Sequence, residues 1–204
     1  MKALIFSGGE FLALPEDIDT KEYSLIICAD SGYLASKKTG VLPDVFIGDF
    51  DSVSKEEVEI KKIIELNPIK DKTDTQEAID YAIAQGADFI TILGALGKRF
   101  DHALANVHLL KYARSLGAIT EIADVDTHIT LVTDKAEISK KDGFCLSLLP
   151  LTDCTGVSVS GVYYPLENAE MPVGVPYGIS NEFTENKAHI SVDAGELLVI
   201  LSKS

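Results

Sequence analysis

The chain has 204 residues, of which 46% are hydrophobic and 25% are charged, which suits one large or two small soluble domains. Its formal net charge of -14 argues against a nucleic-acid partner, because such a surface repels phosphates. No apolar stretch is long enough to span a bilayer or to serve as a signal peptide, and the three cysteines lack metal-ligand spacing, so we expect a cytoplasmic protein with reduced thiols and no membrane partner.

The first part of the chain alternates short apolar runs with amphipathic segments. Continuous apolar strands between such helices indicate a parallel sheet that is covered on both faces, and therefore an α/β fold. We predict strands at Lys2–Phe6, Ser24–Ala29, Asp44–Gly48, Asp88–Leu93 and Ile119–Ala123, and helices at Gly32–Lys38, Lys55–Leu66, Thr75–Gln85 and Asp101–Leu116.

After about Asp124 the pattern changes to short β-branched segments separated by turn residues, with no convincing amphipathic helix. This pattern is typical of a small antiparallel sandwich or barrel. We therefore predict two domains, an α/β domain over residues 1–124 and an all-β domain over residues 125–204. The expected strands are Thr127–Thr133, Ala136–Ser139, Gly143–Leu149, Gly156–Ser160, Lys187–Val192 and Glu196–Ser202.

Two aspartates follow one of the buried strands of the first domain. Asp49 and Asp51 stand at the carboxyl end of Asp44–Gly48, where α/β sheets bind their ligands. In an extended chain residues i and i+2 point the same way, so both carboxylates can converge on one cation, and Mg²⁺ prefers such oxygen ligands. The alternative is that one aspartate caps the next helix while the other is solvated.

A dense alternation of lysines and aspartates, Lys70–Asp74, precedes the next predicted helix. A helix N-terminus favours anions, so the lysines could hold phosphates while Asp74 holds the metal. Asp74 and Glu77 also form a start that is similar to a capping box, and capping explains part of this local composition.

A glycine-rich loop leads into the third of these helices. Gly94 and Gly97 let the backbone approach a ligand closely, and Arg99 can bind phosphate with two hydrogen bonds. The spacing is not that of a Walker A loop. Asp101 has the alternative role of helix N-cap, and His102 is either a ligand or acid–base group or an ordinary first-turn residue.

The stretch Gly178–Glu182 (GISNE) places short polar residues after a glycine in the second domain. Such residues suggest a turn, and they would also suit hydrogen bonds to a polar heterocycle. From spacing alone the turn is the favoured interpretation.

In this order, these clusters resemble the thiamine pyrophosphokinase family. Each is modest by itself, but the ordered set is specific and spans nearly the whole chain. The matching stretches are Cys28–Gly32 (CADSG), Pro43–Ser52 (PDVFIGDFDS), Asp71–Ile79 (DKTDTQEAI), Leu93–Asn106 (LGALGKRFDHALAN), Gly178–Glu182 and the final strand Leu197–Leu201.

The resemblance implies an N-terminal Rossmann-like catalytic domain with a parallel sheet, which binds ATP and Mg²⁺, followed by a C-terminal all-β sandwich domain, which binds thiamine. It also implies a homodimer and the conversion of ATP and thiamine into AMP and thiamine diphosphate. Asp49, Asp51 and Asp74 would be the Mg²⁺ aspartates, and Arg99 and Asp101 would lie in the catalytic cleft. The expected ATP-binding residues are Asp30, Ser31, Gly32, Lys72, Thr73, Gly94, Gly97 and His102, and the expected thiamine contacts are Ser180, Asn181 and Tyr164.

Two departures from the family pattern stand out. Lys98 occupies the place of the second of two adjacent glycines that family members often carry before the arginine. Some relatives place a tryptophan against thiamine, but this chain has none, and Tyr164 takes the aromatic place in a similar segment. Tyrosine can still stack on a cationic thiazolium, although more weakly than tryptophan.

Pyrophosphoryl transfer depends mainly on positioning and on charge stabilisation, which suits these residue types. Lys72 and Arg99 would offset developing charge, and Asp101 is the candidate for orienting the thiamine hydroxyl or accepting its proton. One alternative is a Mg²⁺-dependent nucleotide phosphohydrolase, which the aspartates alone permit. Another is a non-catalytic nucleotide or thiamine sensor, which seldom needs so many clustered charges.

Overall fold

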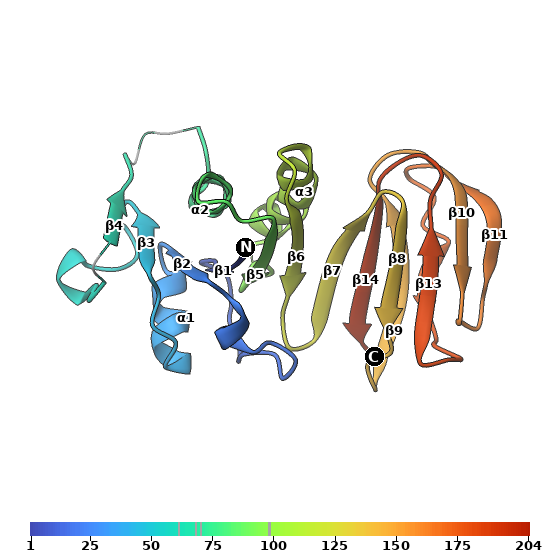
Figure 1. The fold of residues 1–204 in the computed structure, drawn as a ribbon, viewed down its shortest axis with the longest axis horizontal. Coiled ribbons are helices and arrows are strands. Elements are labelled where there is room, and N and C mark those ends of the chain that lie inside the picture. The colour runs from blue at the N-terminus through green and yellow to red at the C-terminus, as the bar shows by residue number, and fades with distance from the viewer. Residues whose placement is uncertain (61, 68, 70, 98) are drawn as a thin grey trace. The chain divides into compact units, whose positions relative to one another are not determined.

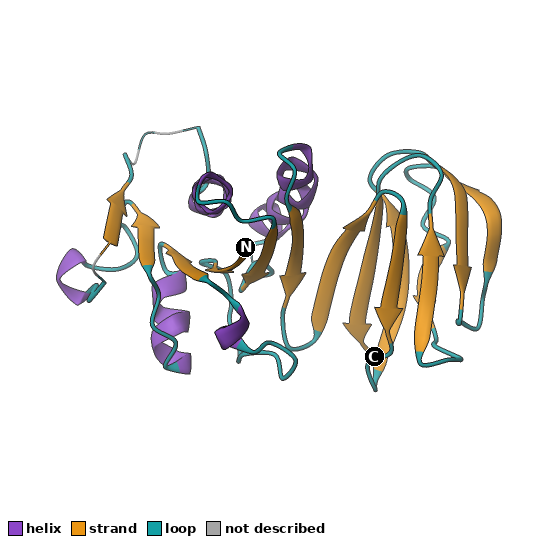
Figure 2. Cartoon of the chain, viewed as in Figure 1, coloured by secondary structure: helices purple, strands orange, loops and turns teal. Residues whose placement is uncertain are grey.

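The computed structural model describes residues 1–60, 62–67, 69, 71–97 and 99–204, and the chain divides into two compact units, Met1–Val125 and Asp126–Ser204. The sequence analysis named Lys70 and Lys98, and both lie outside the described residues. Helices occur in the first unit, whereas the second unit is built from strands and loops (Figure 2). None of the described helices combines the length and the apolar character that a membrane crossing requires.

Parallel strands form the sheet of the first unit, in the order β6-β5-β1-β2-β3-β4 (Figure 1). The strand β1 lies inside this sheet, and its residues Ala3–Phe6 have no exposed surface. Burial on both faces explains why the parallel strands read as continuous apolar runs. The strands are β1 (Lys2–Phe6), β2 (Leu25–Ala29), β3 (Val45–Gly48), β4 (Lys62–Glu65), β5 (Phe89–Leu93) and β6 (Ile119–Ala123).

Three α-helices cover this sheet within the described residues: α1 (Gly32–Thr39), α2 (Asp74–Ala84) and α3 (Phe100–Ser115). In Figure 1, α1 lies on one side of the sheet, and α2 and α3 lie on the other. Helix α1 contacts β1 and β2, α2 contacts β1 to β3, and α3 packs against β6 and α2. Short 3₁₀ turns lie at Thr20–Glu22 and Lys55–Glu57.

The prediction of a helix at Lys55–Leu66 is wrong. The chain forms a 3₁₀ turn at Lys55–Glu57 and then strand β4, which pairs in parallel with β3 from Lys62 to Glu65. The apolar residues of this segment have a spacing that fits a helix, but the free edge of β3 provides backbone hydrogen bonds along a whole strand. Tertiary pairing has therefore overridden the local pattern.

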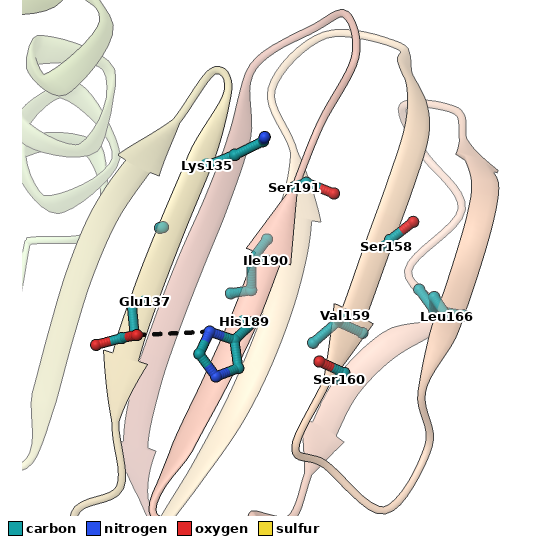
Figure 3. A pocket seen from close by; sticks show the side chains of 10 residues that line it. Lys135, Glu137, Ser158, Val159, Ser160, Leu166, His189, Ile190 and Ser191 are labelled. Atoms are coloured by element: carbon teal, nitrogen blue, oxygen red, sulfur yellow. Dashed lines mark ion pairs between the residues drawn. The ribbon is translucent and has the colours of Figure 1, made fainter.

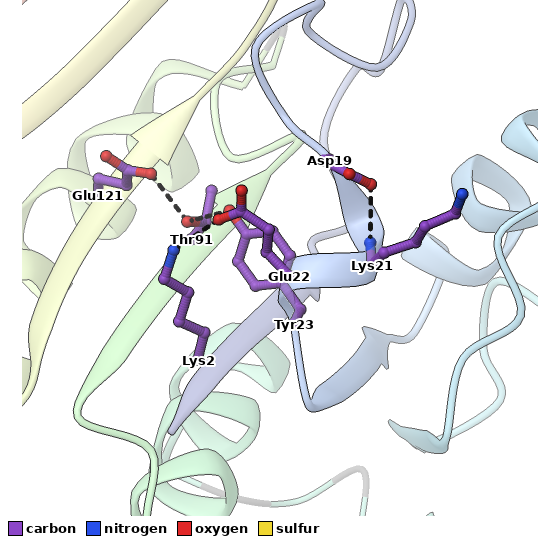
Figure 4. A network of polar contacts seen from close by, with 7 residues as sticks. All are labelled: Lys2, Asp19, Lys21, Glu22, Tyr23, Thr91 and Glu121. Atoms are coloured by element: carbon purple, nitrogen blue, oxygen red, sulfur yellow. Dashed lines mark hydrogen bonds and ion pairs between the residues drawn. The ribbon is translucent and has the colours of Figure 1, made fainter.

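A polar network crosses one face of this sheet (Figure 4). The Tyr23 hydroxyl lies 2.9 Å from Thr91 Oγ1, and this oxygen in turn donates to Glu121 Oε1 at 2.8 Å. Lys2 pairs with Glu22 at 2.7 Å beside the network. Thr91 has no exposed surface and burial raises the pKa of Tyr23, so this network satisfies polar groups that the sheet would otherwise bury alone.

The second unit contains two antiparallel sheets, in the orders β12-β9-β14-β7 and β11-β10-β13-β8. Side chains from both sheets share one hydrophobic core, with Leu146, Val157, Met171 and Leu197 among its fully buried members. The strands are β7 (Thr127–Val132), β8 (Lys135–Ser139), β9 (Phe144–Pro150), β10 (Cys154–Ser160), β11 (Leu166–Met171), β12 (Gly178–Asn181), β13 (Lys187–Ser191) and β14 (Leu197–Lys203).

Sequence reasoning missed two strands of this unit. The sequence pattern did not indicate β11, and the favoured turn at Gly178–Glu182 is wrong because Gly178–Asn181 forms β12. The turn-forming residues have a structural reason, since the pairing with β9 shifts register inside β12 and Ser180 has a φ of 58°. A residue in the left-handed region changes the direction in which the following side chains of a strand point, and the strand continues.

The chain is therefore a mixed α/β protein, with parallel strands in its first unit and antiparallel strands in its second, in agreement with the α/β class expected from the sequence.

Candidate active site

The carboxyl ends of β1, β2, β3 and β5 surround a cleft of about 900 Å³ in the first unit. The chain builds the sheet outward from β1 through β2 to β4, and then places β5 on the other side of β1. The order of strands reverses at this point, and ligands of open α/β sheets bind in the crevice that such a reversal opens. The N-terminal ends of α2 and α3 also line the cleft.

The loops after β1 and β5 touch each other at the floor of this cleft. Ser7 N donates to Leu93 O at 2.8 Å, and Gly9 N donates to Gly94 O at 2.9 Å. A Cβ on Gly9 would lie 2.3 Å from Gly94 O, so only glycine permits this approach.

Residues Ser7 to Glu10 line the cleft, and sequence reasoning assigned them no part in the site. The signal was available, since a glycine pair directly after the first strand of an α/β domain is typical of a ligand-binding loop.

Three carboxylates converge beside this loop. One oxygen each of Asp30, Asp49 and Asp51 lies within 4.8 Å of the others. Asp30 follows β2, and the other two follow the adjacent strand β3, so the parallel pairing of these strands brings them together. Sequence reasoning expected Asp49 and Asp51 to converge, but placed Asp30 with the nucleotide.

The two aspartates after β3 converge through a turn and not through the extended chain that the sequence suggested. Phe50, between them, has a φ of 64°, and Asp51 N donates to Asp49 Oδ1 at 3.3 Å. The Phe50 ring stacks on Phe46 of β3 at a centroid distance of 4.8 Å. We infer that this aromatic contact stabilises the left-handed backbone, which otherwise costs a non-glycine residue of order 1–3 kcal/mol.

Asp30 is also held in an uncommon conformation, with a φ of 46° and its backbone N–H donating to Ile47 O at 2.8 Å. Gly48 permits the approach, because a Cβ there would lie 3.1 Å from the Asp30 Cα. The Asp30 side chain is 7% exposed, and its Oδ1 is buried without a hydrogen-bond partner among the described residues. A buried carboxylate oxygen in this state is stabilised by a cation.

A divalent cation fits this group of residues. The donors are carboxylate oxygens, which are the hard ligands that Mg²⁺ takes, and the repulsion among three nearby carboxylates is relieved by a positive charge. Asp74, which the sequence analysis expected as the third ligand, lies on the wall of the same cleft but is not a member of this cluster.

Helix α2 begins beside the cleft, and its cap differs from the one suggested by the sequence. Thr73 is the N-cap, since its side chain accepts from Gln76 N at 3.2 Å, and Asp74 is the first residue of the helix. The start similar to a capping box that the sequence suggested for Asp74 and Glu77 is therefore wrong.

Lys72 lines the cleft and pairs with Asp80 of α2 at 2.8 Å. The hydrogen bond to Asp80 and then its charge raise the pKa of Lys72, so the ammonium group is charged at neutral pH. The Tyr112 hydroxyl of α3 donates to the other oxygen of Asp80 at 2.7 Å. One carboxylate thus connects both helices with a cationic residue of the cleft.

Arg99 and Asp101 form an ion pair at the start of α3, with 2.7 Å between Nη2 and Oδ2 and 3.3 Å between Nε and Oδ1. Arg99 occupies the N-cap position and Phe100 begins the helix, so the alternative of Asp101 as the N-cap is wrong. The hydrogen bond from Arg99 lowers the pKa of Asp101. Both residues line the cleft together with His102.

Asn106 also lines the cleft, and sequence reasoning assigned it no part in the site. It is buried on α3, and its Nδ2 donates to Ala95 O at 2.8 Å, which fixes the loop after β5. Six of the eight expected nucleotide residues line the cleft: Asp30, Ser31, Lys72, Thr73, Gly97 and His102. Gly32 and Gly94 serve the backbone instead, since a Cβ on Gly32 would lie 2.0 Å from Phe6 O and Gly94 adopts the left-handed region with a φ of 63°.

The second unit brings two of its three expected ligand contacts together. Asn181 is buried and its side chain hydrogen-bonds the backbone of Tyr164, whereas the Tyr164 side chain is 67% exposed. The rings of Tyr163 and Tyr164 meet edge to face at 4.8 Å. Ser180 is exposed, and its backbone N–H donates to Ser147 Oγ at 3.0 Å.

A hollow of about 440 Å³ lies on the face of β8, β13 and β10 that carries Glu137 and His189 (Figure 3). His189 Nδ1 lies 3.5 Å from Glu137 Oε2, and Glu137 also pairs with Lys187, which lowers its pKa. None of the residues expected at a site lines this hollow. Glu137 and His189 of this hollow face each other across the neighbouring strands β8 and β13.

Comparison with known proteins matches the two units in chain order. The family model described as "Thiamin pyrophosphokinase, catalytic domain" matches residues 19–120, and the one described as "Thiamin pyrophosphokinase, vitamin B1 binding domain" matches residues 133–197. The chain belongs to the thiamine pyrophosphokinase family. The family resemblance expected from the ordered motifs is thus confirmed.

Individual members of the thiamine pyrophosphokinase family align with the whole chain. The thiamine pyrophosphokinase of Bacillus subtilis (strain 168) is 30% identical, over 97% of both sequences. A crystal structure of thiamine pyrophosphokinase from Bacillus subtilis superposes with a TM-score of 0.88 at 27% identity, covering 100% of both chains. A thiamin pyrophosphokinase family protein from Enterococcus faecalis superposes with a TM-score of 0.89 at 31% identity, again covering 100% of both chains.

Proposed function

We propose that this protein transfers a pyrophosphoryl group from ATP to thiamine and so produces thiamine diphosphate and AMP. The observation that carries the proposal is the cluster of Asp30, Asp49 and Asp51 at the strand-order reversal of a chain whose relatives are named thiamine pyrophosphokinases. A cleft that carries both converging carboxylates and cationic side chains suits a phosphorylated, metal-bound substrate.

In this proposal Asp30, Asp49 and Asp51 hold Mg²⁺, and Asp74 remains in the proposed metal set because it lines the same cleft. The bound Mg²⁺ would neutralise phosphate oxygens and orient them for in-line attack. Nearly all of the remaining work is positioning and charge stabilisation by the residues of the chain.

The phosphates of ATP bind to groups that already face the cleft. In the loop from Ser7 to Glu10, Gly8 lets a phosphate approach the backbone closely, and the N-terminus of α2 at Thr73 favours anions. Lys72 and Arg99 supply positive charge, and Ser31, Gly97 and His102 complete the nucleotide wall.

Asp101 orients the attacking hydroxyl of thiamine in this scheme. Arg99 lowers the pKa of Asp101, which makes its carboxylate a weaker base, so we favour orientation of the hydroxyl over full proton abstraction. The short distance between the two side chains lets Asp101 hold the hydroxyl while Arg99 faces the phosphate.

The finer architecture belongs to the same proposal. We assign residues 1–124 to a Rossmann-like catalytic domain and residues 125–204 to a β-sandwich domain that binds thiamine, with Tyr164, Ser180 and Asn181 at the thiamine site. The parallel sheet of the first unit and the shared core of two antiparallel sheets in the second support this assignment.

We further propose a cytoplasmic homodimer. Between Tyr163 and Ile179, the second unit exposes an unusual number of large apolar side chains, and such residues often mark interaction sites. They are Tyr163, Tyr164, Val173, Val175, Tyr177 and Ile179, with exposed fractions from 45% to 67%. Sedimentation velocity over a range of protein concentrations tests this proposal, and a monomer at micromolar concentration contradicts it.

The activity is tested with purified protein, ATP, MgCl₂ and thiamine, with chromatographic detection of AMP and thiamine diphosphate. We expect the two products in equal amounts and only when thiamine is present. Release of phosphate or AMP without thiamine would indicate the phosphohydrolase alternative. Binding of both substrates without turnover would indicate the sensor alternative.

The metal set is tested separately with Mn²⁺, whose electron paramagnetic resonance signal reports binding without any turnover. Asp51→Asn should weaken Mn²⁺ binding, because it removes one of three converging charges. Asp142→Asn is the matched control, since Asp142 lies in an exposed turn of the second unit. Equal Mn²⁺ affinity in wild type and Asp51→Asn contradicts the metal assignment.

A further inference from the structure

Two segments of the second unit run side by side and are joined by successive contacts. Val162 and Phe183 form an antiparallel bridge, and Tyr163 N donates to Glu182 O at 2.8 Å. The next pair in this ladder would be Tyr164 and Asn181. At that position the Asn181 side chain, and not the Asn181 backbone, forms the hydrogen bonds to the backbone of Tyr164.

The Asn181 side chain makes three hydrogen bonds. Its Oδ1 accepts from Tyr164 N at 2.9 Å and from Glu182 N at 3.1 Å, and its Nδ2 donates to Tyr164 O at 2.8 Å. The amide thus holds both backbone polar groups of Tyr164, as a neighbouring strand would. The two acceptor positions of Oδ1 are used, so this oxygen has no capacity left for a ligand.

The backbone around Asn181 explains why its side chain turns inward. The pairing of β12 with β9 shifts register between Gly178 and Asn181, and Ser180 has a φ of 58°. As a result Ser180 and Glu182 are exposed, while Asn181 is only 8% exposed.

The Tyr164 backbone that Asn181 holds belongs to a pair of exposed, adjacent tyrosines. The side chains of Tyr163 and Tyr164 are 64% and 67% exposed, and their rings meet edge to face. An exposed ring can bind a cation such as the thiazolium of thiamine through its π face. Ordering a loose aromatic segment during binding costs free energy, and a segment that is already ordered avoids that cost.

We propose that Asn181 is a positioning residue, which acts on thiamine through Tyr164 and not by direct contact. The amide holds the Tyr164 backbone so that the ring is presented in one orientation. This inference rests on the proposed function, and it replaces the direct thiamine contact that the family resemblance implied for Asn181.

A double-mutant cycle tests the inference. The KM values for thiamine and ATP are measured for wild type, Asn181→Ala, Tyr164→Ala and the double variant. We expect Asn181→Ala to raise the thiamine KM at least about threefold, within the roughly 2- to 30-fold range of one cation–π contact, and to leave the ATP KM unchanged. In the Tyr164→Ala background the same substitution should have no further effect, because the ring it positions is absent.

Asn186→Ala is the matched control, since Asn186 is an exposed asparagine in the same unit. Independent, multiplying effects of Asn181→Ala and Tyr164→Ala would show direct contact and would overturn the inference. An unchanged thiamine KM in Asn181→Ala would also overturn it. A wild type without thiamine diphosphate synthesis overturns the proposed function itself and this inference with it, so the two failures are distinguishable.

A second readout does not depend on turnover. The chain contains no tryptophan, so Tyr164→Trp places a single, selectively excitable tryptophan at the position in question. Adding Asn181→Ala should lower its fluorescence anisotropy, and the isosteric Asn181→Asp should lower it as well because it removes the donor to Tyr164 O. Equal anisotropy in folded proteins with and without the Asn181 amide overturns the positioning role, even if Asn181→Ala reduces stability.

Discussion

Ser7 Oγ and Thr75 Oγ1 lie 2.8 Å apart in the interior of the first unit, although 68 positions separate them in the chain. Ser7 follows β1, and Thr75 is the second residue of α2. This contact therefore connects the loop after β1 to the start of α2 across the cleft. Both side chains are almost fully buried, at 3% and 6% exposure. The wall that carries Thr73 and Asp74 is therefore anchored to the floor of the cleft by a hydrogen bond between hydroxyl groups.

Thr75→Val should destabilise the protein, because it leaves the buried Ser7 hydroxyl without its partner while keeping the shape of the side chain. We expect a loss of about 1–3 kcal/mol in the free energy of unfolding. Urea denaturation followed by circular dichroism measures it, and Ser7→Ala/Thr75→Val should lose less than the sum of the two single variants. Thr155→Val, at an exposed position of β10, is the control and should stay within about 0.5 kcal/mol of wild type.

Asp74→Asn should nearly abolish turnover and leave the fold intact. The helix keeps its cap, because Thr73 accepts the Gln76 N–H, and a partly buried charge next to a helix N-terminus contributes at most about 2 kcal/mol. Thr73→Ala is the converse control, which should cost about 1 kcal/mol of stability through the lost cap. Steady-state kinetics and urea denaturation measure both effects. Wild-type activity in Asp74→Asn would remove Asp74 from the metal and phosphate machinery.

Arg99→Gln should raise the pKa of Asp101 toward the ordinary aspartate value. In the native protein the hydrogen bond from Arg99 favours the carboxylate, so the stabilisation by this pair is present above the unfolded-state pKa and is lost as the pH falls through the lower folded-state pKa. Carboxyl ¹³C chemical shifts across an acid titration report the pKa directly. Arg114→Gln, at the other end of α3, is expected to leave Asp101 unchanged, and an equal shift in both variants would contradict the assigned cause.

Cys28 should resist thiol reagents in the folded protein. Its side chain has no exposed surface, and burial raises its pKa to about 12, so the thiolate needed for reaction is scarce at pH 8. Cys145, which is partly exposed, should react first with a chromogenic disulfide reagent. Absorbance together with peptide mapping identifies the labelled residue. Modification of Cys28 at the same rate with and without denaturant would contradict its burial.

The sequence predicted well those features that a few neighbouring residues determine. The runs at Lys2–Phe6 and Ile119–Ala123 became strands with the predicted bounds. In the first of them Ala3–Phe6 are fully buried, and residues buried on both faces of a sheet must be apolar. The helix after the glycine-rich loop was displaced by only one residue at each end. The segment Lys55–Leu66 failed because the same apolar spacing fits a helix and an edge strand, and only the neighbouring β3 decides between them.

By itself, the sequence determined the alternating α/β order of the first unit, the strand-rich second unit and the ordered motifs that identify the family, since all three depend on residue types and their spacing. The tertiary structure alone decided which side chains meet. Asp30 joins Asp49 and Asp51 because β2 and β3 pair in parallel and because Phe50 stacks on Phe46 in a left-handed turn. Asn181 holds Tyr164 because a register shift turns its side chain inward. Such contacts depend on strand order and on rare backbone angles, which no local pattern of residues specifies.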